Sequence, residues 1–276
     1  MKKDKYEDEE FSITMELQKP IIDEEKEQKK ENPKNYKKYF FVGIIILFLG
    51  MFSFTFIWLI DSYEAKELAE SSIISDENIS VTYGDFITFK PKEEVDKGLI
   101  LYPGAKVEAK AYSYLAREIA KRGYQVVVVD MPLNIAFLSQ NKAQEVILKY
   151  PNIKHWFIGG HSMGGVAACN FASSSNEIDG IVLLASYPSN ESLKNSNKRV
   201  LSIWGTKDGV LNFEHLLSSK ENLPKDTTYV EIEGGNHAQF GDYGKQKGDG
   251  EAAIDTKEQV DLTVDNIVEF MENTEK

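Results

Sequence analysis

The sequence has 276 residues, of which 42% are hydrophobic and 28% are charged, and its formal net charge is −12 at pH 7. This length fits one sizeable domain with appendages, and an acidic chain without a basic patch excludes nucleic acid as an expected partner. The single cysteine, Cys169, excludes an intrachain disulfide and is expected to be a small buried residue of a helix.

The first distinctive segment is the uncharged run "YFFVGIIILFLGMFSFTFIWLI", residues 39–60. At about 1.5 Å per residue, a helix of this length spans roughly 33 Å and crosses a hydrocarbon core of about 30 Å. The alternative is a secretory signal peptide, which has an apolar region of about 7–15 residues and a short leader. Because 38 residues precede the run, we expect an uncleaved transmembrane helix that anchors the chain in the cell membrane.

The residues that flank this run predict its orientation. Six lysines lie shortly before it, whereas only Lys66 follows it closely, so the positive-inside rule places the N-terminus in the cytoplasm and the rest outside. The tail of residues 1–38 has 10 lysines and 11 acidic residues and is predicted to be disordered. Its charge of −1 leaves −11 for the part after Ile60, which is not attracted to anionic lipid headgroups.

Residues 61–80 are polar and serine-rich and are predicted to form a linker, whereas residues 81–276 have the pattern of an α/β domain. Two short strands are expected around Tyr83–Asp85. Further strands are predicted over 98–103, 124–132, 155–160, 178–188, 198–209 and 227–235, and helices over 109–123, 136–151, 163–175 and from a capping box at Thr256 and Gln259. Near-continuous apolar strands separated by helices predict a mostly parallel sheet with helices on both faces. Functional residues of such sheets lie at the carboxyl ends of the strands.

Gly160, Ser162 and Gly164 form the pattern G-x-S-x-G between a predicted strand and a predicted helix. A nucleophile on a sharp strand-to-helix turn has a strained backbone, and glycines two positions away avoid collisions there. A serine that only caps the helix does not need these glycines. A phosphate-binding loop would continue into a Lys-Ser or Lys-Thr pair, which is absent. The pattern therefore predicts that Ser162 is a catalytic nucleophile.

A serine nucleophile needs a base, because its hydroxyl is inert at neutral pH. The chain has four histidines. His155 lies at the amino end of its strand, His161 is expected to point away from the nucleophile, and His215 lies on a helix face. His237 follows the last predicted strand in the glycine-rich loop "EGGNHAQFG", so we expect it to act as the base.

The acid that orients the base should lie between the nucleophile and the base in chain order, after a strand. The stretch "LSIWGTKDGV" supplies Asp208, which also fits a turn residue of an Asp-Gly pair. Asp179 precedes its strand, and Glu231 and Glu233 alternate within a strand, so they are weaker candidates. Asp208 is therefore predicted to complete a Ser-Asp-His triad.

The oxyanion of an acyl-transfer reaction needs two backbone N–H donors. One is expected from Met163, the residue after the nucleophile. The other is expected from the loop after the "LILYP" strand, where Pro103 has no N–H and Gly104 allows a substrate to approach closely. We predict Ala105 as this donor, with Lys106 as the alternative.

Four stretches, "YPGAKVEAKAYSYLAREIAKRGYQVVVVDMPLN", "GGHSMGG", "GTKDGV" and "GGNHAQFGDYG", cover about residues 99–244 and resemble the α/β-hydrolase superfamily. The chain is most similar to small, lidless bacterial hydrolases of the dienelactone-hydrolase type. The resemblance implies an eight-stranded sheet and a Ser-His-Asp acyl-transfer mechanism. It departs from the dienelactone hydrolases proper at Ser162, where they carry cysteine, and from many relatives at Pro103-Gly104, where they have His-Gly. The substrate is therefore not carried over.

These observations predict a membrane-anchored extracytoplasmic serine hydrolase, which we expect to be a carboxylesterase acting on small acyl esters. About a dozen residues follow "GIVLLA", which leaves no room for a lid. The alternative is a non-catalytic surface binding protein that keeps the fold. No cofactor and no metal are expected, since Asp242, Asp249 and Glu251 lack a calcium-loop pattern. The sequence does not indicate an oligomeric state.

Overall fold

The computed structural model describes residues 33–274, and the chain divides into two units, Met1–Met51 and Phe52–Lys276. Most of the predicted disordered tail, residues 1–38, lies outside the described residues. Helix α1 (Pro33–Ile60) begins before the predicted span, so residues 33–38 are helical and do not belong to the tail. Its segment Tyr36–Ile57 has a mean hydropathy of 2.6, and it is long and apolar enough to cross a membrane by length and composition.

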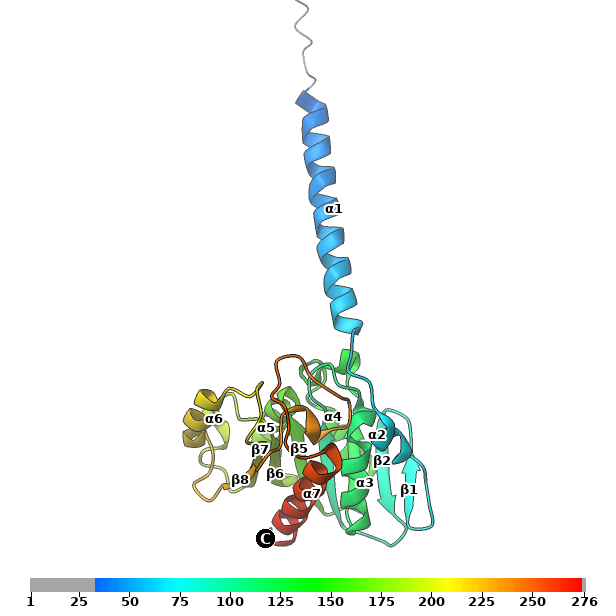
Figure 1. Cartoon of the computed structure of the whole chain (residues 1–276), viewed down its shortest axis with the longest axis vertical. Coiled ribbons are helices and arrows are strands. Elements are labelled where there is room, and N and C mark those ends of the chain that lie inside the picture. Colours follow the sequence, from blue (N-terminus) through cyan, green and yellow to red (C-terminus); the bar gives the residue numbers. More distant parts are fainter. Residues whose placement is uncertain (1–32, 275–276) are drawn as a thin grey trace, which may run out of the picture. The chain divides into compact units, whose positions relative to one another are not determined.

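The second unit is built on an eight-stranded sheet with the order β1-β2-β4-β3-β5-β6-β7-β8 (Figure 1). The strands are β1 (Ile79–Thr82), β2 (Phe86–Pro91), β3 (Lys97–Tyr102), β4 (Gln125–Val129), β5 (His155–His161), β6 (Ile178–Leu184), β7 (Arg199–Gly205) and β8 (Thr228–Ile232). The β1–β2 and β2–β4 pairs are antiparallel, and all other neighbouring pairs are parallel. The prediction of a mostly parallel sheet is therefore confirmed.

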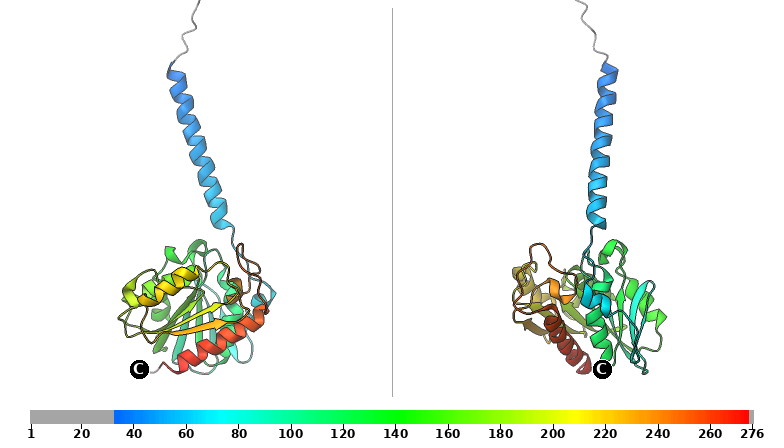
Figure 2. Two further views of the ribbon diagram at one scale, coloured as in Figure 1. Left: turned by 60° about the vertical axis from the view of Figure 1, so that its left-hand side comes forward. Right: turned by 45° about the vertical axis from the view of Figure 1, so that its right-hand side comes forward.

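Helices cover both faces of the sheet (Figure 2). On one face lie α3 (Ser113–Lys121) and α7 (Thr256–Glu272), and on the other lie α4 (Lys142–Lys149), α5 (Met163–Ser174) and α6 (Phe213–Ser219). A separate hydrophobic core lies on each face of the sheet, and alternate residues of β3 point into them. Leu99 and Leu101 pack in the core that contains α3, whereas Ile100 packs in the core that contains α4 and α5. Because both faces of the central strands are buried, these strands are apolar throughout and do not alternate with polar residues.

The structure corrects the linker predicted for residues 61–80. Tyr63 forms a β-bridge with Val107, and the segment continues through helix α2 (Glu67–Ser71) into β1. Ala69 is fully buried, and its N–H donates to the Asp242 carboxylate at 3.0 Å. Only a few residues of this segment contact the domain, and the rest are polar. Its composition therefore resembles that of a linker, although the segment packs on the domain.

Two helix predictions also need correction. Only α4 is an α-helix within the predicted range 136–151, because residues 136–138 form a separate 3-10 turn. The last helix is capped by Asp255, whose side chain accepts from the Glu258 N–H at 2.8 Å, and not by the predicted Thr256 capping box. Gln259, the expected partner in that box, instead hydrogen-bonds the backbone N–H and C=O of Asn236 in the loop after β8, both at 2.8 Å.

Candidate active site

Ser162 occupies the sharp turn between β5 and α5. Its backbone angles, φ 52° and ψ −122°, are rarely adopted by residues other than glycine. A Cβ on Gly160 would collide with the backbone of Gly164 and of Gly165, and one on Gly164 would collide with the carbonyl oxygens of Tyr102 and Pro103. Both glycines are therefore sterically required. The strained strand-to-helix turn that the G-x-S-x-G pattern predicts is present.

Asp208 and His237 form a buried pair at the carboxyl ends of β7 and β8. The Nδ1–H of His237 donates to Oδ2 of Asp208 at 2.8 Å, and the two side chains are 2% and 0% exposed. The other oxygen, Oδ1, accepts from the N–H groups of Val210 and Leu211 at 2.8 and 2.7 Å. Because the carboxylate only accepts, Nδ1 carries the proton of a neutral His237 and Nε2 is left as the acceptor.

Ser162 and His237 line one cavity of about 170 Å³ together with Met163. Nε2 of His237 is buried and has no hydrogen-bond partner among residues 33–274. The hydrogen bond between the Ser162 hydroxyl and Nε2 is therefore not formed here. Such bonds are often long or misaligned before substrate binds. The sheet thus brings Ser162 and His237 to one cavity and Asp208 behind His237, with one of the two expected side-chain hydrogen bonds in place.

The walls of this cavity are mainly apolar. Its other lining residues are Val166, Ala185, Ser186, Tyr187, Val210, Leu211 and Asn212. The Ser186 hydroxyl donates to the Ser162 carbonyl at 2.6 Å, so it is committed to holding the turn. Ligand pockets for drug-sized molecules are about 300–1,000 Å³, and this cavity, of about 170 Å³, is smaller.

His161 is buried beside the predicted base, although the sequence suggests only that it points away from Ser162. Its ring centroid lies 4.6 Å from that of His237, and its Nδ1 lies 2.8 Å from the Tyr112 hydroxyl. Burial holds the pKa of His161 well below the usual histidine value, and the neighbouring His237 lowers it further. His161 is therefore neutral at physiological pH and does not repel a protonated His237.

Tyr112, which ends a 3-10 turn before α3, connects this histidine to the predicted oxyanion loop. Its hydroxyl accepts from the Gly104 N–H at 2.9 Å. Burial raises the pKa of Tyr112, so the phenol keeps its proton and shares a hydrogen bond of 2.8 Å with Nδ1 of His161. The sequence places Tyr112 only within the predicted helix 109–123, so its polar contacts are not visible before folding.

In the loop after β3, two of three consecutive backbone N–H groups donate hydrogen bonds to other parts of the domain. Gly104 donates to Tyr112, and the Lys106 N–H donates to the Asn134 carbonyl at 2.8 Å. Lys106, the alternative oxyanion donor, is thus occupied, and the N–H of Ala105 remains. Met163 is the first residue of α5, where N–H groups have no partner within the helix. Ala105 is not among the residues that line the small cavity.

The remaining candidates do not line this cavity, although the ring centroid of His215 lies 6.1 Å from that of Tyr187 in its wall. His155 is at the amino end of β5, where its Nδ1 lies 2.8 Å from the Asp179 carboxylate. His215 is exposed on α6, and Glu231 is exposed on β8. No group of three or more His, Cys, Asp or Glu side chains that could hold a metal ion occurs in the described part of the chain.

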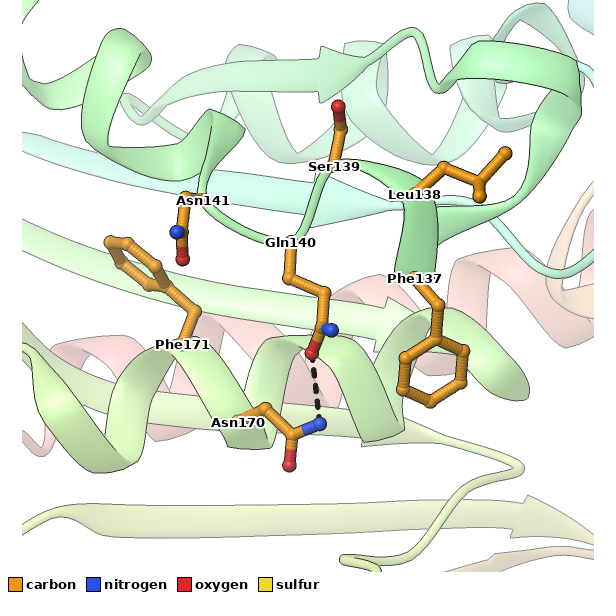
Figure 3. A pocket seen from close by; sticks show the side chains of 7 residues that line it. All are labelled: Phe137, Leu138, Ser139, Gln140, Asn141, Asn170 and Phe171. Carbon is orange, nitrogen blue, oxygen red and sulfur yellow. Dashed lines mark hydrogen bonds between the residues drawn. The ribbon is translucent and has the colours of Figure 1, made fainter.

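A larger cavity of about 470 Å³ lies between the loop before α4 and the C-terminal half of α5 (Figure 3). Gln140 points from the loop toward α5, where Asn170 donates to its side-chain oxygen at 2.9 Å. The other lining residues are Phe137, Leu138, Ser139, Asn141 and Phe171. Because none of these side chains ionises near neutral pH, the larger cavity lacks an acid or a base, and the smaller one is the candidate active site.

Comparison with known proteins decides the family. The model of the alpha/beta hydrolase family matches residues 98–261, a span that includes Ser162, Asp208 and His237. The chain belongs to the alpha/beta hydrolase family. No curated protein matches this hydrolase significantly.

Solved structures share the fold of this hydrolase at low sequence identity. A predicted CIB-like hydrolase from Thermoplasma acidophilum is 19% identical with a TM-score of 0.53, covering 69% of this chain and 98% of its own. Dienelactone hydrolase from Anabaena variabilis is 14% identical with a TM-score of 0.52, covering 69% and 92%. Est1E from Butyrivibrio proteoclasticus with bound ferulic acid is 14% identical with a TM-score of 0.54, covering 73% and 98%. The resemblance to dienelactone hydrolases is confirmed at the level of the fold.

Proposed function

We propose that this protein is a membrane-anchored serine hydrolase whose catalytic domain lies outside the cytoplasm, and that it is a carboxylesterase acting on small acyl esters. The observation that carries the proposal is the buried hydrogen bond between Asp208 and His237, 2.8 Å long, beside a cavity that His237 lines together with Ser162 on its strained turn. The similarity in fold to Est1E, whose structure contains ferulic acid, supports the esterase class.

Each residue of the site has a role in this reaction. Ser162 attacks the acyl carbon while Nε2 of His237 takes the hydroxyl proton, and the carbon–oxygen bond to the alcohol breaks as His237 returns that proton to the leaving group. Asp208 holds His237 in the correct tautomer and stabilises its positive charge. The N–H groups of Met163 and Ala105 stabilise the oxyanion. Water then releases the acid by the same steps.

Helix α1 supports the proposed membrane anchor. Its apolar segment Tyr36–Ile57 is 22 residues long and none of its most apolar window is buried by protein. A helix that is apolar on all sides and unburied by protein favours a lipid environment. The lysines before the segment outnumber those after it, which supports a cytoplasmic N-terminus.

The test is labelling of the full chain with a fluorophosphonate probe that reacts with activated serines. We expect the probe to label Ser162 and the Ser162→Ala variant to remain folded, unlabelled and inactive. Loss of the nucleophile removes on the order of a millionfold in kcat, about 8 kcal/mol of transition-state stabilisation. Absence of labelling in the wild-type protein, or a tenth of its activity in Ser162→Ala, would contradict the proposal and favour a binding protein that retains the fold.

A further inference from the structure

Three loops meet beside the Asp208–His237 pair: residues 206–209 after β7, residues 233–238 after β8, and residues 248–250 before α7. The backbone N–H of Lys207 donates to the Gly235 carbonyl at 2.8 Å, and the Asn236 side chain donates to the Gly250 carbonyl at 2.8 Å. The third loop contains no residue with a role in the proposed reaction, but it contacts both loops that do.

The carboxylate of Asp249 lies at the junction of these loops. Its Oδ1 accepts from the Gly209 N–H at 3.0 Å and from the His237 N–H at 3.2 Å, and its Oδ2 accepts from the Ala238 N–H at 2.8 Å. Oδ1 also accepts from the neighbouring Gly250 N–H at 2.8 Å. Hydrogen bonds to an ionised acceptor are about twice as strong as neutral ones. The Asp249 side chain thus binds two residues next to or within the proposed pair: Gly209, which follows Asp208, and His237 itself.

Glycines allow the loops to approach this closely. A Cβ on Gly209 would lie 2.7 Å from the Gly248 carbonyl oxygen and 2.7 Å from the Gly250 nitrogen. A Cβ on Gly250 would collide with the carbonyl oxygen of Lys207. The backbones of the first and third loops are therefore in direct contact. This allows the Asp249 carboxylate to bind the N–H of Gly209 in the first loop and the N–H groups of His237 and Ala238 after β8.

We propose that Asp249 is a positioning residue that fixes His237 relative to Asp208, an inference that rests on the proposed function. A base must be held within about 0.5 Å and 10–20° of its productive geometry, and a displacement of about 1 Å can cost a hundredfold in rate. The carboxylate links the loop of Asp208, through Gly209, to the loop of His237, beside the backbone hydrogen bond from Lys207 to Gly235. Asp249 does not line the cavity that contains Ser162, and it contacts His237 only at the backbone N–H.

The test compares Asp249→Asn with Asp242→Asn in the full chain. Asp242 is a matched control, because its carboxylate also accepts a backbone N–H, from Ala69 at 3.0 Å, but holds α2 and not the catalytic loops. We expect Asp249→Asn to lower kcat for p-nitrophenyl acetate about 10- to 100-fold with KM within about twofold, and Asp242→Asn to leave both within about twofold of wild type. The rate of fluorophosphonate labelling should fall in parallel with kcat.

A spectroscopic measurement separates positioning from stability. The proton NMR signal of His237 Nδ1–H, identified by its loss in His237→Ala, should weaken or shift in Asp249→Asn and persist in Asp242→Asn. A wild-type kcat and signal in Asp249→Asn would overturn the inference, as would losses in both variants that follow their losses of unfolding free energy. Failure of the wild-type protein to react with the probe would instead overturn the proposed function, while an unchanged signal in Asp249→Asn would overturn this inference alone.

Discussion

At the scale of single residues, the candidate site depends on two adjacent imidazoles with different environments. His237 faces a carboxylate, whereas His161 faces the hydroxyl of Tyr112. Burial keeps the pKa of His161 low, so this ring stays neutral at physiological pH. The proposed base is therefore the histidine that faces a carboxylate, and its neighbour is a neutral ring that packs against it.

The low pKa of His161 predicts how stability depends on pH. The unfolded chain binds a proton on this histidine below about pH 6.5, whereas the folded chain does not, so stability falls as pH decreases below that value. One such proton changes the unfolding free energy by at most about 1.4 kcal/mol per pH unit. Urea unfolding between pH 7.5 and 5.0 should therefore show a smaller decrease for His161→Gln than for wild type. Equal decreases would show that His161 is protonated in the folded state.

At the scale of elements, the turn between β5 and α5 is held by close backbone packing. Gly164, in the first turn of α5, lies against the carbonyl oxygens at the end of β3. These carbonyls belong to the strand that leads into the predicted oxyanion loop, so the contact fixes the nucleophile and that loop together. A rigid backbone neighbour cannot move aside as a flexible side chain does.

Gly164→Ala is accordingly expected to destabilise the protein by about 3 kcal/mol or more, at the upper end of overpacking effects. Gly84 in the turn between β1 and β2 offers a matched control, because a Cβ there meets nothing within 4 Å. Gly84→Ala should change the free energy of unfolding by no more than about 0.5 kcal/mol. Urea unfolding of both variants measures the difference. Similar stabilities would contradict the packing argument.

The connection between β6 and β7, residues 185–198, predicts the preference for acyl length. It contains a single 3-10 turn, Glu191–Leu193, and no lid. Each acyl methylene that is buried contributes about 0.8 kcal/mol of binding free energy, roughly fourfold in kcat/KM. This gain requires a cavity wall that removes the methylene from water. We expect kcat/KM for p-nitrophenyl esters of two to sixteen carbons to stop rising within a few carbons. A steady rise to the longest chains, or activation above the micellar threshold, would indicate a lipase.

At the scale of the whole molecule, the chain joins one apolar helix to one α/β-hydrolase domain. Residues 62–80 pack on that domain through Tyr63, Ala69 and β1. The net charge of −11 after Ile60 lies in the part that the lysine pattern places outside the cytoplasm.

Protease added to intact cells should therefore digest the part of the chain after Ile60 and spare a tag at Met1. The lysines before the apolar run favour a cytoplasmic N-terminus. Immunoblots against tags at Met1 and Lys276 check this topology, with lysed cells as the control for access. A protected tag at Lys276 beside an accessible one at Met1 would reverse the orientation.

The sequence predicted those features that depend on short segments. Apolar runs indicated the strands, and glycines around Ser162 indicated the strained turn. The chain order of Asp208 and His237 led to two residues that the structure places 2.8 Å apart, although their catalytic roles stay predictions. The contacts of Tyr112 and Asp249 depend on loops that meet only in the folded domain, and no local pattern records them. Ala69 was missed because one buried alanine does not alter a polar composition.

The strand order has a consequence for the time at which the site forms. From β3 onward the sheet grows at one edge in chain order, through β5, β6, β7 and β8. Synthesis proceeds from the N-terminus, so the turn with Ser162 emerges before the strands that precede Asp208 and His237. In a nascent chain the proposed nucleophile is therefore present before the proposed base, so the proposed reaction with esters cannot begin until the last strands have been made. An interrupted chain that ends before β8 would also expose β7 as an open edge, which favours aggregation over premature activity.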